Sequence, residues 1–198
     1  TAVAAYRGRV DPQADVQELL AELLFADLDQ VIGRIAKLEA SIKKPTAKRD
    51  EYLREMELMK RLEAALEAEK PISDAIGSEA EGKLVRSFAF LSQKPLLVVR
   101  NLSEDAVRGA SEEAVGGVEC LPLSAKIEEE IAELPPEERG VFLADLGASE
   151  SARDRLIRAC YRKLNLVSFL TTGEDEVRAW TIPAGADAVT AAGEIHSD

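Results

Sequence analysis

Residue types that often mark catalytic or secreted proteins are scarce in this chain. Its 198 residues include one histidine, two cysteines and only 5% aromatic residues. The histidine, His196, lies near the end of the sequence, which favours a surface residue over a general base. Cys120 and Cys160 stand far apart, without a CxxC or Cys/His cluster. No disulfide framework or zinc site is therefore predicted, and we expect two reduced, buried thiols in a cytosolic protein.

Long apolar runs are also absent. No run approaches the roughly 18–20 residues that a membrane span requires. The first ten residues, TAVAAYRGRV, lack the basic-then-apolar layout of a signal peptide. We therefore expect a cytoplasmic protein with no membrane partner. The apolar content of 46% is enough for a core built mainly from Leu, Val, Ile and Ala.

The glycine-rich motif that binds nucleotide phosphates is missing as well. The sequence contains no GxxxxGK[ST], and no DxxG precedes the first long helical pattern. Without these motifs the polypeptide as written is not expected to cradle a triphosphate or to position Mg²⁺. We assign it no catalytic residue and no metal ligand.

Negative charge predominates, but unevenly. The net charge is −12; residues 101–154 hold 14 acids against 4 bases, whereas residues 15–70 hold 13 acids against 10 bases. An acidic surface disfavours non-specific binding to phosphate backbones. One basic face is predicted at helical spacing, formed by Arg155, Arg158 and Arg162 with Lys163 alongside. Both a solvated helix face and an RNA or ribosome contact remain open for it.

Two long helices are predicted in the first part of the chain. Asp11 is typical of an N-cap and Pro12 of a first helical turn. An apolar seam then advances in steps of three and four, and a second seam follows a turn at residues 43–46. The two seams are Leu28, Val31, Ile35, Leu38 and Ile42, and Tyr52, Met56, Met59, Leu62 and Leu66. This pattern predicts an antiparallel coiled-coil hairpin over residues 15–70.

Shorter helices and strands alternate in the rest of the chain, which indicates an α/β fold. A helix is predicted over 78–91, with Ser78 as N-cap and Glu81 completing a capping box. Residues 105–116 read as a loop or a weak helix, and residues 183–198 as a loop. Further helices are expected near 128–133, 137–146 and 151–164, and strands over 96–100, 117–123, 166–171 and 176–182.

Polar residues follow two of these apolar strands directly. The almost fully apolar run at 96–100 predicts a buried strand of a parallel sheet, and it runs into Asn101-Leu102-Ser103-Glu104. The strand at 117–123 runs into Ser124-Ala125-Lys126. Ligands of doubly wound α/β folds bind at the carboxyl ends of parallel strands, and an Asn amide offers a purine both a donor and an acceptor. The pair of motifs predicts the base-binding half of a GTPase-type site. The alternative for Asn101 alone is that it merely starts a turn.

Several longer segments resemble the Obg-like ATPase (YchF) family over essentially the whole chain. They are GRVDP at 8–12, SQKPLLVVRNLSE at 92–104, LSAKIEEEIAEL at 123–134 and, most specifically, the block from 154 to 198. In that family a P-loop G domain carries a helical hairpin and is followed by a TGS domain of β-grasp type. The match is weaker between 105 and 117, where the family has a clear helix.

The resemblance implies a domain plan and a site. Residues 1–14 would be a linker from an N-terminal G domain, 15–70 the hairpin, 71–164 the base-recognition part of the G domain, and 165–198 a truncated TGS domain. The P-loop and both switch regions would lie upstream of Thr1. Nucleotide contacts would come from a group of six residues: Asn101, Leu102, Glu104, Ser124, Ala125 and Lys126.

The resemblance also implies an activity. The parent protein would be a ribosome-associated hydrolase of ATP, and secondarily of GTP, that uses Mg²⁺ and contacts ribosome or RNA through the hairpin and TGS domain. Replacement of the usual Asn-Lys-x-Asp by Asn101-Leu102-Ser103-Glu104 fits a preference for ATP. The alternative is an RNA- or protein-binding module without catalysis. The sequence does not predict an oligomeric state.

Overall fold

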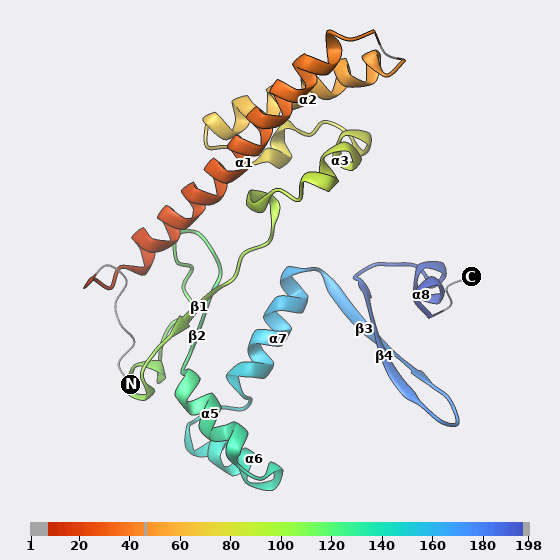
Figure 1. The fold of residues 1–198 in the computed structure, drawn as a ribbon. Helices are drawn as coiled ribbons and strands as arrows, with labels where there is room; N and C mark the ends of the chain where they lie inside the picture. The colour runs from red at the N-terminus through yellow and green to blue at the C-terminus, as the bar shows by residue number, and fades with distance from the viewer. Residues whose placement is uncertain (1–7, 46, 196–198) are drawn as a thin grey trace. The chain divides into compact units, whose positions relative to one another are not determined.

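The computed structural model describes residues 8–45 and 47–195, which fall into two compact units, 8–94 and 95–195 (Figure 1). The first unit is helical, and the second contains all the strands of the described chain. Each unit is described below by itself.

Two long helices dominate the helical unit. Helix α1 (Pro12–Ile42) begins at Asp11, whose carboxylate accepts a hydrogen bond from Ala14 N–H at 3.1 Å. Helix α2 (Arg49–Glu67) packs along α1 after the turn. The acid before the proline thus supplies the N-cap that the sequence predicted, because it satisfies an amide with no partner inside the helix.

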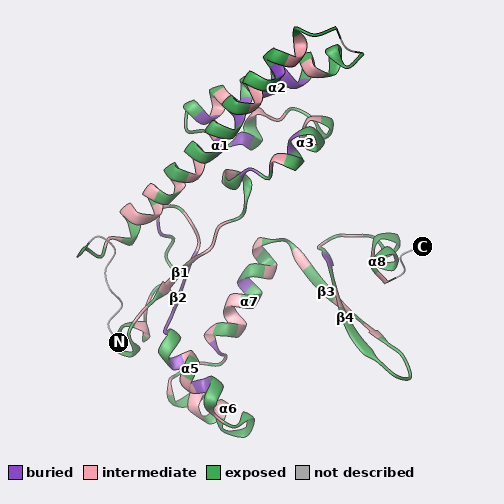
Figure 2. Ribbon diagram, viewed as in Figure 1, coloured by how far each residue is buried: buried purple, intermediate pink, exposed green. Residues whose placement is uncertain are grey.

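The apolar seams of α1 and α2 meet in one continuous core. Val31 and Leu38 of α1 are buried there, and so are the seam residues of α2 except the partly buried Tyr52. Figure 2 shows the buried segments of this unit on the facing sides of the two helices. Glu55 is also buried in α2 and accepts two hydrogen bonds from Arg34, both at 2.7 Å. A bidentate pair of this kind satisfies the carboxylate where it leaves bulk water.

The helix predicted over 78–91 is interrupted. Helix α3 (Glu79–Val85) begins at Ser78, whose hydroxyl accepts from Glu81 N–H. The Glu81 carboxylate accepts from Gly77 N–H rather than from Ser78, so only one half of the predicted capping box forms. Two short 3₁₀ turns, η3 (Arg86–Phe88) and η4 (Leu91–Gln93), replace the rest of the predicted helix, and another, η2 (Ile72–Ala75), precedes α3.

A buried acid explains the end of this unit. Asp27 of α1 is only 2% exposed, and its carboxylate accepts from the N–H groups of Leu91 and Ser92, each at 2.8 Å. These amides open η4 and have no partner within a 3₁₀ turn. The long-range cap therefore holds η4 against α1, and Ala89, in a left-handed conformation at φ 51°, redirects the chain towards it.

The second unit starts with two short parallel strands. Strand β1 (Val98–Asn101) pairs with β2 (Cys120–Leu123), and Asn101 lies opposite Leu123. Helix α4 (Glu104–Val107) is a single turn at the start of residues 105–116, the stretch predicted as a loop or a weak helix. β2 is buried throughout, whereas Val99 of β1 is 44% exposed. The prediction of a fully buried first strand is therefore wrong for β1, which pairs with a single strand among the described residues.

Three helices follow β2: α5 (Ala125–Glu133), α6 (Pro136–Asp145) and α7 (Ala152–Lys163). Prolines at 135 and 136 separate α5 from α6, because proline lacks an amide donor and suits a first helical turn. Ser151 caps α7 by accepting from Asp154 N–H at 3.1 Å. Ile127 and Ile131 of α5 are buried, one turn apart on the same helix face.

The chain then forms an antiparallel hairpin, β3 (Leu166–Thr172) and β4 (Val177–Pro183), joined by the Gly-containing turn that the sequence predicted. Helix α8 (Ala188–Ile195) follows, so the prediction of a loop throughout 183–198 is wrong. The overlooked signal is Asp187, whose carboxylate accepts from Thr190 N–H at 2.8 Å at the start of an alanine-rich segment.

The two cysteines have different environments. Both carry free thiols; Cys120 is buried in β2, whereas Cys160 is exposed on α7. The expectation of two buried thiols is therefore wrong for Cys160. His196 lies outside the described residues. No helix within the described ranges is long and apolar enough to cross a membrane.

Candidate functional site

The carboxyl ends of β1 and β2 bring together the six residues singled out from the sequence. Parallel pairing places Asn101 beside Leu123, so the segments that follow the two strands leave the sheet at the same edge. The N–H of Leu102 donates to Leu123 O at 2.8 Å and extends the pairing by one step. Residues 101–104 and 124–126 therefore face a common region, although residues 105–123 separate them in the chain.

Asn101 connects the two segments directly. Its side-chain Oδ1 accepts a hydrogen bond from Ala125 N–H at 3.0 Å. This bond assigns the amide oxygen to the β2 side, and the Nδ2 group carries two donors at an exposed position. A turn-forming Asn would bond to the backbone just ahead of it in the chain, whereas this bond reaches the start of α5.

Glu104 and Lys126 form a second connection between the same segments. The ammonium group of Lys126 donates to the Glu104 carboxylate and also lies 3.7 Å from Glu130. The hydrogen bond to Lys126, followed by its positive charge, lowers the pKa of Glu104. The hydrogen bond to Glu104 likewise raises the pKa of Lys126. Both side chains are largely solvated, so the pair orients them more than it stabilises the fold.

Ser124 is the buried member of the site, only 3% exposed. Its backbone carbonyl accepts from Glu128 N–H at 3.1 Å, as expected for the residue that precedes α5. Its hydroxyl oxygen has no hydrogen-bond partner among the described residues. Ser124 also lines a pocket of about 440 Å³ enclosed by the loop after α4, by α5 and by the segment before α7. The other five residues of the predicted site lie outside this pocket lining.

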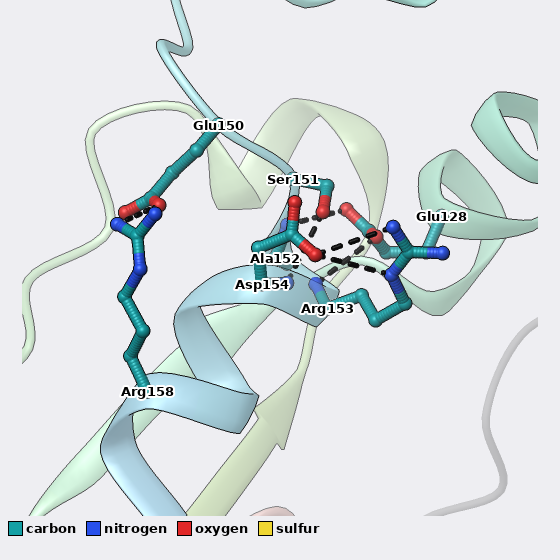
Figure 3. A network of polar contacts seen from close by, with 7 residues as sticks. All are labelled: Glu128, Glu150, Ser151, Ala152, Arg153, Asp154 and Arg158. Carbon is teal, nitrogen blue, oxygen red and sulfur yellow. Dashed lines mark hydrogen bonds and ion pairs between the residues drawn. The ribbon is translucent and has the colours of Figure 1, made fainter. Parts of the chain in front are cut away.

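Sequence reasoning missed the role of Glu128, which ties α5 to α7. Its carboxylate accepts from the N–H groups of Ala152 at 2.7 Å and Arg153 at 3.1 Å, at the start of α7 (Figure 3). A carboxylate at a helix N-terminus satisfies free amides and the helix dipole together. No local signal marks this acid, because it stands in a run of glutamates and caps a helix 24 residues away.

The predicted basic face of α7 exists, but each of its charges has an acidic partner. Arg155 pairs with Glu112, Arg158 with Glu150, and Arg162 with Glu119 at 2.7 Å. Lys163 also contacts Glu119, at 3.3 Å. These pairs reduce the positive potential that a nucleic acid would meet. No group of three or more His, Cys, Asp or Glu side chains in residues 8–45 and 47–195 is placed to hold a metal ion.

Known proteins match this chain over nearly all of its length. Residues 166–198 match the family model YchF-GTPase_C, described as a protein of unknown function (DUF933). The chain is 41% identical to the "Ribosome-binding ATPase YchF" of Bacillus subtilis, over 96% of this chain and 54% of that protein. It is 31% identical to "Obg-like ATPase 1" of Caenorhabditis elegans, over 99% of this chain and 52% of that protein.

A solved structure agrees with these sequence matches. The structure of the Schizosaccharomyces pombe YchF GTPase superposes with a TM-score of 0.80 and 28% sequence identity, over 100% of this chain and 56% of that chain. The chain is homologous to proteins of the Obg-like ATPase (YchF) family. The resemblance read from the sequence is thereby confirmed, as is a mixed α/β fold of the YchF type.

The chain spans about half the length of the YchF relatives that it matches. Within this YchF homologue, the geometry places all six predicted site residues at one edge of the β1–β2 sheet. Their role in nucleotide binding stays a prediction.

Proposed function

We propose that residues 95–195 supply the base-binding half of a purine nucleotide site in a longer protein of the Obg-like ATPase type. The observation that carries the proposal is the hydrogen bond from Ala125 N–H to Asn101 Oδ1, formed where two parallel strands end together. Ligands of doubly wound α/β proteins bind just outside the carboxyl ends of such strands. An amide held between two strand ends is a preorganised group for reading a flat base.

Asn101 is the residue that we propose recognises the purine base. The exposed Nδ2 group donates to N7, which is an acceptor in both adenine and guanine. Leu102 supplies apolar contact to the ring, and Ser124 and Ala125 border the base from the neighbouring strand end. Glu104 and Lys126 flank the base. ATP is the preferred ligand and GTP a secondary one.

Hydrolysis is assigned to the longer protein rather than to this chain. The curated relatives are named as ATPases. The 198 residues contain no GxxxxGK[ST], and their described part has no group of three or more His, Cys, Asp or Glu side chains placed to hold a metal ion. We therefore attribute the metal and phosphate contacts to segments beyond these residues, and we expect this chain alone to be inactive.

Ribosome association is proposed from the names of the bacterial relatives. The α1–α2 pair would act as a coiled-coil hairpin, and residues 165–198 as the start of a TGS domain, each as a contact surface. The plan of linker 1–14, hairpin 15–70, G-domain part 71–164 and TGS start 165–198 remains a prediction. A ribosomal partner places the proposed site of action in the cytoplasm.

An RNA- or protein-binding module without catalysis is the second candidate. The observation in its favour is the turn between α1 and α2, where Lys43, Lys44, Lys48 and Arg49 are all exposed. Residues 43–49 contain no acid, whereas residues 8–94 as a whole hold 17 acids against 14 bases. A basic tip on an acidic protein attracts phosphate backbones.

Calorimetry on the full-length protein tests the first candidate. ATP should bind the full-length protein and not this chain alone. Asn101→Ala should weaken ATP binding about tenfold or more, since a good contact to a base edge contributes roughly 1–3 kcal/mol. Ser103→Ala is the matched control, because Ser103 lies in the same loop and its side chain forms no cap bond to α4. Unchanged ATP binding by Asn101→Ala would move the binding-module candidate to first place.

A further inference from the structure

We propose that the pocket beside α5 is a second binding site, which takes a small amphipathic anion: a molecule with an apolar body and one carboxylate or sulfonate group. The pocket has a volume of about 440 Å³ and is bordered by the loop after α4, by α5, by the end of α6 and by the segment before α7. Small-molecule sites typically measure about 300–1,000 Å³. Of the six residues proposed to contact nucleotide, only Ser124 lines this pocket, so the inference does not rest on the proposed function.

The pocket walls carry apolar side chains from three different elements. Leu123 ends β2, Ile127 and Ile131 lie on the buried face of α5, and Leu143 and Leu146 come from the end of α6. Transfer of an apolar ligand surface from water to such walls is favourable by roughly 25 cal/mol per Å². The walls therefore select a ligand with an apolar body.

A buried hydroxyl group in the lining has no partner. Ser124 is only 3% exposed, and its Oγ forms no hydrogen bond within the described residues. Most buried polar side chains are hydrogen-bonded, and an unpaired one costs roughly 1–3 kcal/mol. A hydroxyl both donates and accepts, so one polar group on a ligand would satisfy it. This group distinguishes the pocket from a gap between apolar side chains.

The charged residues of the lining leave one positive group available. Glu128 accepts from the first amides of α7, and Glu150 pairs with an arginine of that helix (Figure 3). Arg155 pairs with Glu112. Arg108, directly after α4, is exposed and forms no ion pair within residues 8–45 and 47–195. The charge that remains for a ligand is therefore positive, and it calls for an anion.

The exposure of Arg108 limits the contribution of the charge. A hydrogen bond between a guanidinium group and an anion is stronger than a neutral one, but solvent weakens it at an exposed position. We expect loss of the Arg108 charge to weaken binding of an anionic ligand roughly three- to tenfold. A neutral ligand of the same shape should be unaffected.

Two fluorescent dyes test the inference on the full-length protein. Anilinonaphthalene sulfonate has apolar rings, an N–H group and a sulfonate; phenylnaphthylamine is the same molecule without the sulfonate. Saturating ADP is present throughout and keeps the dyes out of a nucleotide site. Ala148→Phe fills the pocket and should weaken both dyes about tenfold or more, through lost burial of the rings. Ala144→Phe is the matched control, one turn earlier at an exposed position outside the lining.

Two further variants separate the polar contacts. Arg108→Gln should weaken the sulfonate dye roughly three- to tenfold and leave the neutral dye unchanged. Ser124→Ala should weaken both dyes, about two- to tenfold, since both carry the N–H group that would meet the hydroxyl. Octanoate, an aliphatic carboxylate, should displace the sulfonate dye. A merely structural effect of Arg108→Gln would change both dyes alike.

The outcomes decide the inference without reference to nucleotide binding. Dye binding that Ala148→Phe leaves unchanged overturns it, because the dye then lies elsewhere. Equal weakening of the two dyes by Arg108→Gln, or no weakening of either, overturns the assignment of an anion. Arg108 is exposed, so this second test stands even where Ala148→Phe fails to fold. An Asn101→Ala variant that still binds ATP normally would overturn the proposed function alone.

Discussion

The helical unit and the strand-containing unit differ in how completely they bury their large apolar side chains. The continuous core of ten buried residues lies entirely within residues 8–94. In residues 95–195, large apolar side chains such as Val141, Leu170 and Val177 are about two-thirds exposed. Figure 2 shows β3 and β4 mainly as exposed ribbon. The difference reflects how helices and strands cover their apolar surfaces.

A helix can cover its apolar stripe with the next helix along the chain, because a short turn brings the two into contact. A strand has two edges and two faces, and a two-stranded sheet covers few of them. The β1–β2 and β3–β4 sheets have two strands each within the described chain. We therefore expect the helical unit to be the more stable one when the chain is studied alone.

The largest expected effect lies in the helical core. Phe90 is 1% exposed and stacks on Phe88 with ring centroids 5.4 Å apart. Phe90→Ala should destabilise this unit by about 3–5 kcal/mol, through lost apolar burial and a remaining cavity. Far-UV circular dichroism, to which α1 and α2 contribute most, should record the loss in urea unfolding.

Two features make this measurement specific. The only tryptophan, Trp180, lies in β4 and reports on the other unit. Its fluorescence transition should stay in place when Phe90 is replaced. Val141→Ala is the control for an exposed apolar residue, expected to change stability by no more than about 0.5 kcal/mol. A single transition that shifts equally by both probes would show that the units unfold together.

A smaller effect is expected at the cap that joins α5 to α7. Glu128→Gln keeps the side-chain shape but removes the charge that faces the first amides of α7. The loss should be about 1–2 kcal/mol in the strand-containing unit, in the range for helix caps and charged hydrogen bonds. Trp180 fluorescence during urea unfolding measures it. Glu129→Gln makes the same charge change at the adjacent exposed position and should have little effect; equal losses would contradict the role of the cap.

The smallest expected effect depends on pH. Hydrogen bonds from Arg162 first, and then from Lys163, lower the pKa of Glu119 below its usual 4.5. A carboxylate with a lowered folded-state pKa stabilises fully above its unfolded pKa, and the stabilisation is lost as pH falls through the folded value. The Trp180 transition of the wild type should therefore move to lower urea concentration below about pH 4.5. Glu119→Gln should flatten that dependence slightly; an identical pH profile would show that the pair contributes nothing.

The sequence predicted short local features better than the extent of the helices. The seam residues of α1 and α2, the N-cap at Asp11 and the strand–Asn101 and strand–Ser124 junctions follow from patterns of a few residues. The helix α8 was missed because it is short, contains Gly193 and follows Pro183 and Gly185. The interruption of the helix predicted at 78–91 was missed because a distant acid, Asp27, stabilises the 3₁₀ turn at 91–93.

The sequence by itself determined most of the segments that form helices and strands and pointed to the six residues of the candidate site. It also indicated the protein family, since the motifs at 101–104, 124–126 and 154–198 are recognisable without coordinates. Only the tertiary structure decided the partners: Ala125 N–H for Asn101 and Lys126 for Glu104. Periodicity reports which face of an element is apolar, but a hydrogen bond between residues more than 20 positions apart depends on how strands and helices are packed.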